Sequence, residues 1–372
     1  MILSCQNISK AFVENQVLKN VSFHIEDHEK AAIVGINGAG KTTLLRIIVG
    51  EMTPDDGQVV LARDKTLGYL AQNSTVDTSH TIYEELLSVK ADLLRLEEKI
   101  RECENNMKHA EGDALEDLMK QYTSLTHAFE TGGGYLYRSE LVGVLKGLGF
   151  TEDEFSKPVA TLSGGQKTRV ALGRLLLQNP DLIILDEPTN HLDMNSIAWL
   201  ETYLLNYKGA VLIVSHDRYF LDRVCNRIVE VDKGSIYSYD ANYSGYLELK
   251  AEREEMQQAS ERKRQNILRK ELEWIRRGAK ARTTKQKGRI QRYEKLKDQD
   301  APQTDGSVEI SSISSRMGKT TVELSHISKS YDSRVLIRDF TYIFLKNDRI
   351  GFVGANGSGK TCLLYTSPSP RD

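Results

Sequence analysis

The chain has few cysteines, and none of them are spaced as a redox or zinc motif requires. Cys5, Cys103, Cys225 and Cys362 are scattered over 372 residues, and the eight histidines show no metal-like spacing. This pattern argues against a disulfide framework and against a structural zinc site. It is typical of a reducing compartment, so we expect a cytoplasmic location.

The chain also lacks any apolar run long enough to cross a bilayer. Its first residues lack the basic segment and apolar core of a signal peptide. We therefore expect no direct membrane insertion. The apolar share of 40% is sufficient for ordinary packed cores, and the length suggests two to three domains.

The net charge of -2 conceals one strongly basic segment. Residues 250–297 hold 17 Lys or Arg against 7 Asp or Glu, and eight basic residues between Trp274 and Tyr293 have no acid among them. A solvated helix face normally carries interleaved acids, so this block favours contact with a phosphate backbone. The candidate residues for this polyanion contact are Arg276, Arg277, Lys280, Arg282, Lys285, Lys287 and Arg289.

A glycine-rich motif occurs twice. Residues 35–42 read GINGAGKT, and residues 354–361 read GANGSGKT. The first copy follows an expected strand at 31–34 and precedes an expected helix at 41–49, so main-chain N–H groups and the helix N-terminus would face phosphates. Lys41 would neutralise β and γ oxygens, and Thr42 would offer its hydroxyl to Mg2+. The repeat extends upstream, where Phe12 corresponds to Tyr331.

Two further segments carry chemistry. An apolar strand expected at 182–185 ends in Asp186 and Glu187, the position where α/β folds bind ligands. Asp186 is placed to hold Mg2+ through its water shell, and Glu187 to orient an attacking water. Residues 162–166, LSGGQ, open a helix and give a second anion-binding N-terminus.

At this spacing the LSGGQ segment matches the signature of the ATP-binding cassette superfamily, which the chain resembles. The resemblance implies ATP and Mg2+ as cofactors. It assigns adenine stacking to Phe12, although Tyr is more usual there, and contact with Mg2+ and the lytic water to Gln72. It matches residues 190–193 to the D-loop and His216 to the switch histidine that contacts the γ-phosphate.

The resemblance therefore implies three sets of site residues. The catalytic residues are Glu187, His216 and Gln72, and the Mg2+ ligands are Thr42, Gln72 and Asp186. The nucleotide-binding residues are Phe12, Gly35, Asn37, Gly38, Ala39, Gly40, Lys41, Thr42, Thr43, Ser163, Gly165, Gln166, Tyr331, Gly354, Asn356, Gly357, Gly359, Lys360 and Thr361. In this superfamily the signature of one cassette completes the site of the other, so the ATP on Lys41 would need a signature from a second cassette.

The fold class expected is α/β: a P-loop cassette with an inserted helical hairpin arm, a long helical linker hairpin and the start of a second cassette. Apolar residues at alternating steps of three and four predict the arm at about 82–131, as two helices with seams at 86–107 and 115–129. The expected parts are the first cassette at 1–240, the basic linker at 241–300, a flexible joint at 301–321 and a second-cassette stub at 322–361. The linker is expected to contain a long helix at 243–277 and a returning helix with Ile290, Tyr293 and Leu296.

Two cassettes, DEPTNHLD at 186–193 and a basic helical linker together resemble the ABC-F family, and residues 271–285 resemble its Uup-like branch. The resemblance implies a cytosolic ATPase that acts on the ribosome in translation, with linker contacts to rRNA and tRNA. Two alternatives remain: a DNA-associated ATPase, which the linker charge permits, and the ATPase subunit of a transporter, for which the basic linker has no evident use.

Residues 362–372, CLLYTSPSPRD, do not continue the pattern of a P-loop helix, because two prolines follow within ten residues. The run resembles the conceptual translation of a transposase sequencing adapter. We therefore expect that these residues are not native, that the second cassette is truncated, and that the chain binds ATP but turns it over poorly.

Overall fold

The computed structural model describes residues 1–13, 15–71, 79–276, 320–331, 334–345, 348–354 and 357–365. Compact packing divides the chain into two units: one combines Met1–Tyr243 with the segment that starts at Val322, and the other starts at Ser244. Among the described residues, no helix is both long and apolar enough to span a membrane.

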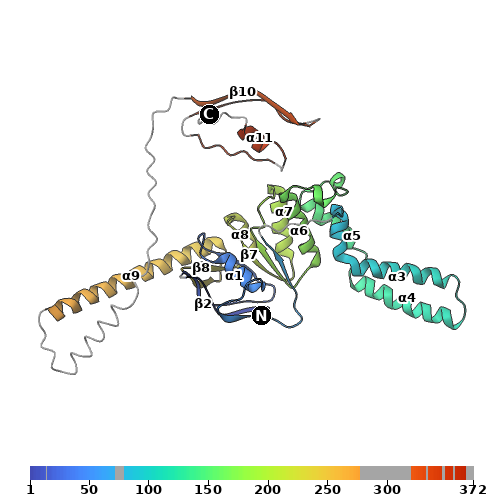
Figure 1. The fold of residues 1–372 in the computed structure, drawn as a ribbon, viewed down its shortest axis with the longest axis horizontal. Helices are drawn as coiled ribbons and strands as arrows, with labels where there is room; N and C mark the ends of the chain where they lie inside the picture. The colour runs from blue at the N-terminus through green and yellow to red at the C-terminus, as the bar shows by residue number, and fades with distance from the viewer. Residues whose placement is uncertain are drawn as a thin grey trace. The chain divides into compact units, whose positions relative to one another are not determined.

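The first unit contains a six-stranded sheet in the order β5-β6-β7-β3-β8-β9. Figure 1 labels two of its strands, β7 and β8. Its strands are β3 (Lys30–Val34), β5 (Leu67–Leu70), β6 (Leu182–Asp186), β7 (Ala210–Val214), β8 (Arg227–Asp232) and β9 (Ser235–Tyr239). Neighbouring strands from β5 to β8 are parallel, and β9 is antiparallel to β8. Every residue of β6 and β7 is buried, which explains the uninterrupted apolar sequences at 182–185 and 210–214. The α/β fold class is confirmed.

A second, antiparallel sheet has the order β2-β1-β4. Its strands are β1 (Leu3–Phe12), β2 (Asn15–Ile25) and β4 (Asp56–Leu61). Helix α1 (Lys41–Ile48) joins the two sheets in one core, because its buried face, including Leu44 and Leu45, clusters with residues of β1, β2, β3, β6, β7 and β8. The P-loop that precedes α1 is thus fixed on a packed support.

Further helices complete this unit: α2 (Ile82–Leu87), α5 (Tyr137–Gly147), α6 (Gly164–Gln178), α7 (Met194–Asn206) and α8 (Arg218–Val224). Two glycines permit close approach between them. A Cβ on Gly147 would lie 2.1 Å from the Trp199 ring, and one on Gly173 would lie 3.2 Å from Leu86. Side chains of α7 and α2 therefore occupy the space that these glycines leave.

The arm is formed by α3 (Ala91–Met107) and α4 (Asp113–Thr131), which run side by side (Figure 1). The prediction of one continuous first arm helix is wrong, because a 3-10 turn at Ser88–Lys90 separates α2 from α3. The physical reason is tertiary: Leu86 is fully buried and lies against the Gly173 surface of α6, away from the arm seam.

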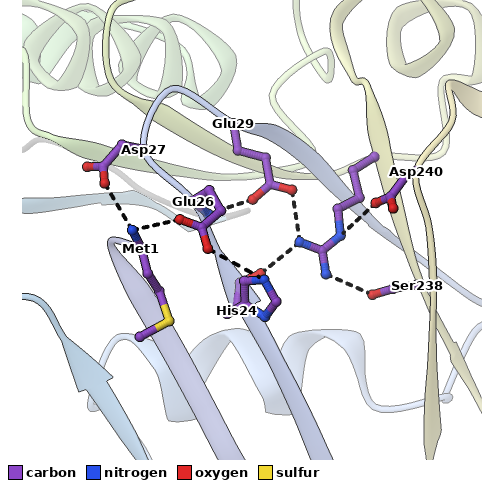
Figure 2. A network of polar contacts seen from close by, with 8 residues as sticks. Met1, His24, Glu26, Asp27, Glu29, Ser238 and Asp240 are labelled. Carbon is purple, nitrogen blue, oxygen red and sulfur yellow. Dashed lines mark hydrogen bonds and ion pairs between the residues drawn. The ribbon is translucent and has the colours of Figure 1, made fainter.

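Arg227, at the start of β8, links the two sheets. Its guanidinium donates to the His24 carbonyl of β2 across 3.0 Å and to the Glu29 carboxylate across 2.9 Å. It also donates to Ser238 Oγ across 3.0 Å and lies 3.7 Å from the Asp240 carboxylate. Figure 2 shows Glu29, Ser238 and Asp240 converging on one group. This network connects the antiparallel sheet to the hairpin of β8 and β9.

Helix α9 (Tyr243–Arg276) has 34 residues, and all but the first belong to the second unit. The expected returning helix, including Ile290, Tyr293 and Leu296, lies outside the described residues. So do residues 301–319 of the expected flexible joint and the candidate RNA-contacting residues from Arg277 to Arg289, while the last two residues of the joint, 320 and 321, already belong to a strand. Arg276 is described by its backbone alone.

The second copy of the repeat forms β10 (Thr320–Tyr331), β11 (Arg334–Leu345) and α11 (Lys360–Tyr365). It repeats a main-chain to hydroxyl bond of the first copy: Asn7 N–H donates to Ser22 Oγ across 2.8 Å, and His326 N–H donates to Thr341 Oγ1 across 2.9 Å. The expectation that no helix follows Thr361 is wrong for residues up to 365, which lie in α11. Leu363 is buried, so this short helix has one side chain packed against the rest of the protein. Residues 366–372 lie outside the described residues.

Candidate functional site

The P-loop between β3 and α1 depends on its glycines. Gly35 and Gly40 have φ of 155° and 104°. A Cβ on Gly35 would lie 2.5 Å from the Val231 carbonyl oxygen, and one on Gly40 would lie 2.6 Å from Val17. Gly40 is the N-cap of α1 and supplies no side-chain cap, so the first-turn N–H groups of α1 remain available to an anion.

Lys41 folds back over this loop. Its ammonium donates to the carbonyl oxygens of Gly35 and Ile36 across 2.7 and 3.0 Å. Partial burial lowers the pKa of Lys41, and the nearby carboxylates of Glu187 and Asp186 act in the opposite direction. A cation is therefore held at the mouth of an anion-binding loop.

The two acids lie at the end of β6. Asp186 is 4% exposed; burial raises the pKa of its carboxyl, as does the Glu187 charge, while Lys41 lowers it. Glu187 has φ of 53°, a left-handed conformation that is uncommon outside glycine. Its N–H donates to the Val214 carbonyl across 2.8 Å. The bond to β7 holds the chain in this turn and directs the Glu187 carboxylate toward His216.

His216 follows β7, next to β6 in the sheet. Its N–H donates to Glu187 Oε2 across 3.3 Å, and its Nε2 lies 3.7 Å from Glu187 Oε1. The imidazole is largely exposed. Asp217, the next residue, caps α8 by accepting from the N–H groups of Tyr219 and Phe220. The end of β7 is thus fixed on both sides of the histidine.

These groups line one cavity of about 630 Å³. It brings together the predicted residues Phe12, Asn37, Gly38, Gly40, Lys41, Thr42, Thr43, Asp186, Glu187 and His216. Three lining residues were not in the predicted set: Val17, Asn190 and Val214. Asn190 could have been found from its place in the D-loop segment. Val17 had no motif, because it reaches the cavity through the pairing of β2 with β1.

The signature segment has its own geometry. Ser163 is the N-cap of α6 and forms a reciprocal capping box with Gln166. A Cβ on Gly165 would lie 3.0 Å from His191, so the D-loop histidine packs against the start of α6. Ser163, Gly165 and Gln166 are not among the residues that line the Lys41 cavity.

The second P-loop resembles the first where it is described. Lys360 donates to the Gly354 carbonyl across 2.5 Å, as Lys41 does to Gly35. Gly357 and Gly359 have φ of 75° and 93°. Thr361 lies in α11. Asn356 and Gln72 lie outside the described residues, and Tyr331 is described by its backbone alone.

The residues present fit a Mg2+ ion. Buried Asp186 and the Thr42 hydroxyl line the same cavity, and oxygen donors of this kind suit a hard cation. Within the described part of the chain, no group of three or more His, Cys, Asp or Glu forms a metal cluster. Mg2+ is often bound by one or two protein groups together with substrate phosphates, so a small donor set is consistent with it.

Comparison with known proteins places these elements in a family. Residues 18–190 match a family model described as ABC transporter, and residues 229–310 match a second model with the same description. The chain is 41% identical over 364 residues to the uncharacterized ABC transporter ATP-binding protein YfmR of Bacillus subtilis, covering 98% of this chain and 57% of that protein. It is 37% identical over 367 residues to the energy-dependent translational throttle protein EttA of Mycobacterium tuberculosis, covering 98% of this chain and 65% of that protein.

The chain thus spans less than two thirds of the length of these relatives. A solved structure titled as the ATP binding subunit of an ABC transporter is similar over 64% of this chain and 90% of its own, with a TM-score of 0.48 and 22% identity. The two matched models, together with the P-loop and the acids that end β6, show that the chain carries an ATPase domain of the ABC transporter family.

Proposed function

We propose that the cassette at the start of the chain binds ATP with Mg2+ and hydrolyses it to ADP and phosphate. One observation carries this proposal: Lys41, the adjacent pair Asp186 and Glu187, and His216, which come from three separate parts of the sequence, line a single cavity. That set provides a phosphate clamp, a metal ligand, a base and a polar contact for the terminal phosphate.

Lys41 supplies the phosphate clamp. Its ammonium is held by two P-loop carbonyls, and β and γ phosphate oxygens would replace them as acceptors. The exchange gives the lysine a charged partner in place of two neutral ones. Because α1 starts at Lys41, its N–H groups add positive potential at the same place.

Glu187 is the proposed general base. It lies beside Asp186 at the end of β6, and the His216 main chain fixes one of its carboxylate oxygens. The other oxygen remains near His216 Nε2, where a water can bridge the carboxylate and the terminal phosphate. Thr42 and Asp186 would hold Mg2+, which supplies neutralisation of charge on the phosphates when bound.

The signature residues support a two-cassette mechanism. Ser163, Gly165 and Gln166 form an ordered helix start outside the Lys41 cavity. An N-terminus of this kind suits an anion held by another cassette. We therefore propose that ATP closes two cassettes on each other, and that Ser163 to Gln166 serve the nucleotide of the second one.

For the whole protein we propose an ABC-F role in translation, acting on the ribosome. Two observations support it. A relative of 37% identity carries the name translational throttle protein, and the linker segment between Trp274 and Tyr293 holds eight basic residues and no acid. Side chains of this kind suit backbone and shape recognition of folded rRNA and tRNA.

Co-sedimentation tests this role against the DNA-associated alternative. The chain with ATP and Mg2+ is centrifuged with ribosomes, with duplex DNA of matched phosphate concentration, and alone. A matched variant changes Arg276, Arg277, Lys280 and Arg282 to Gln. We expect the chain to pellet with ribosomes and the variant to remain in solution. If as much or more of the chain sediments with duplex DNA and none of it sediments with ribosomes, the translation role is overturned.

A further inference from the structure

The end of strand β1 carries Phe12 to the cavity, but β4 does not support it there. Pairing between β1 and β4 stops at Ser9, which is opposite Asp56, whereas pairing with β2 continues to Phe12. Among the described residues, the last three residues of β1 therefore pair with a strand on one edge and with none on the other. Such an unsupported strand end would leave the Phe12 ring poorly fixed.

Asp55, the residue before β4, bonds to β1 where its pairing with β4 has ended. Its N–H donates to the Ser9 carbonyl across 2.9 Å, and its Oδ2 accepts the Ala11 N–H across 2.7 Å. The carboxylate thus satisfies the main-chain donor that a longer β4 would have paired. This is a charge-assisted bond, stronger than the ladder bond it replaces.

The other oxygen of Asp55 fixes Lys10. Lys10 Nζ donates to Asp55 Oδ1 across 2.6 Å, and 15% of the Lys10 side chain is exposed. The Lys10 and Ala11 bonds together lower the pKa of Asp55. Lys10 is thereby held in one position beside the strand.

That position lies next to the Phe12 ring. Residues two apart in a strand share a face, and Lys10 Nζ lies 6.0 Å from the centroid of the Phe12 ring. Phe12 is 45% exposed and lines the cavity with Lys41. The Lys10 ammonium thus occupies one side of the Phe12 ring, and the rest of the ring surface remains open to the cavity. The spacing of lysine and aromatic recurs in the second copy as Lys329 and Tyr331.

We propose that Asp55 and Lys10 are positioning residues for the nucleotide base: Asp55 fixes the end of β1, and Lys10 fixes the Phe12 ring on which adenine stacks. The pair acts on the base and not on the phosphates, which are held by the P-loop. This inference rests on the proposed binding of ATP at the Lys41 site.

The distinction between base and phosphates provides the test. Binding of ATP and of inorganic tripolyphosphate, each with Mg2+, is measured by calorimetric titration of the whole chain. Asp55→Ala is expected to weaken ATP binding about tenfold, the equivalent of one charge-assisted hydrogen bond. Lys10→Met, which keeps the apolar stem, is expected to weaken it about threefold, the size of an exposed cation–π contact. Neither variant should change tripolyphosphate binding.

Asp56→Ala is the matched control, because it removes one acid from the same turn; its side chain accepts the N–H of Gly57 and has no part in holding Lys10. Unchanged ATP affinity in Asp55→Ala would overturn the inference, and so would an equal loss of ATP and tripolyphosphate binding. A different result would show that the chain does not bind ATP at the Lys41 site. The unmodified chain would then bind neither ATP nor tripolyphosphate, or Lys41→Ala would bind both as well as the unmodified chain.

Discussion

The main-chain N–H of His216 donates to Oε2 of Glu187 across 3.3 Å. The bond connects the carboxyl ends of two adjacent parallel strands, β6 and β7. The P-loop follows the carboxyl end of β3, the next strand in the sheet. It uses the backbone of the histidine, so the imidazole remains exposed. A single main-chain hydrogen bond thus orients the proposed base and leaves the imidazole as a second polar group for the substrate.

Glu187→Gln should separate binding from hydrolysis. The amide oxygen can still accept from the His216 N–H, so the geometry of the site should persist. Loss of the base should lower phosphate release at least about 100-fold, the usual contribution of general base catalysis. ATP affinity should change little, because the phosphate clamp at Lys41 is intact. Phosphate release and ATP titration on the same preparation check both expectations, and an unchanged rate of release would assign the base elsewhere.

Asp181 should make stability depend on pH in acid. It accepts from the N–H and hydroxyl of Thr66 and from Lys65, and these contacts lower its pKa from the ordinary value of 3.8 to about 2. Because the folded-state pKa is the lower one, the stabilisation is present above pH 3.8 and is lost as the pH falls toward 2.

The matched variant is Asp181→Asn. Thermal unfolding of the two proteins is compared at neutral pH and between pH 4 and 2. The difference in Tm should be largest at neutral pH and should shrink toward pH 2, since protonation removes the charge in the unmodified chain. A difference that stays constant over this range would show that the Asp181 charge contributes nothing.

Gly147 and Gly143, both on α5, form a matched pair. Gly147→Ala should destabilise the chain by about 1–3 kcal/mol, because the new Cβ would overlap the Trp199 ring in a packed site. Gly143→Ala meets nothing within 4 Å and should stabilise the chain by about 0.5–1 kcal/mol through helix propensity. Urea unfolding followed by far-UV circular dichroism measures both. Similar midpoints for the two variants would mean that α7 moves away from α5 at little cost.

The sequence predicted the parts of this site that local patterns specify. The P-loop has a fixed glycine spacing, and Asp186 and Glu187 follow an apolar strand, so both could be located without a structure. Phe12 and His216 depended on the family resemblance, and the structure places them in the same cavity. Their proposed roles remain predictions.

Contacts between distant segments could not be predicted. Val17 reaches the cavity through a strand pairing with register shifts, which no periodicity reveals. The break at Ser88–Lys90 arises because Leu86 packs against α6, some 87 residues further along the chain. The bond between Lys10 and Asp55 spans 45 residues. In each case the decisive partner is remote in sequence.

The most direct test of the central claim is calorimetric titration of ATP with Mg2+ into the chain and into Lys41→Ala, with Lys360→Ala as the control. Lys41 shares its cavity with Asp186, Glu187 and His216, so its loss should abolish the high-affinity site. Lys360→Ala should leave the affinity of that site unchanged. ATP binding by Lys41→Ala with the affinity of the unmodified chain would contradict the account.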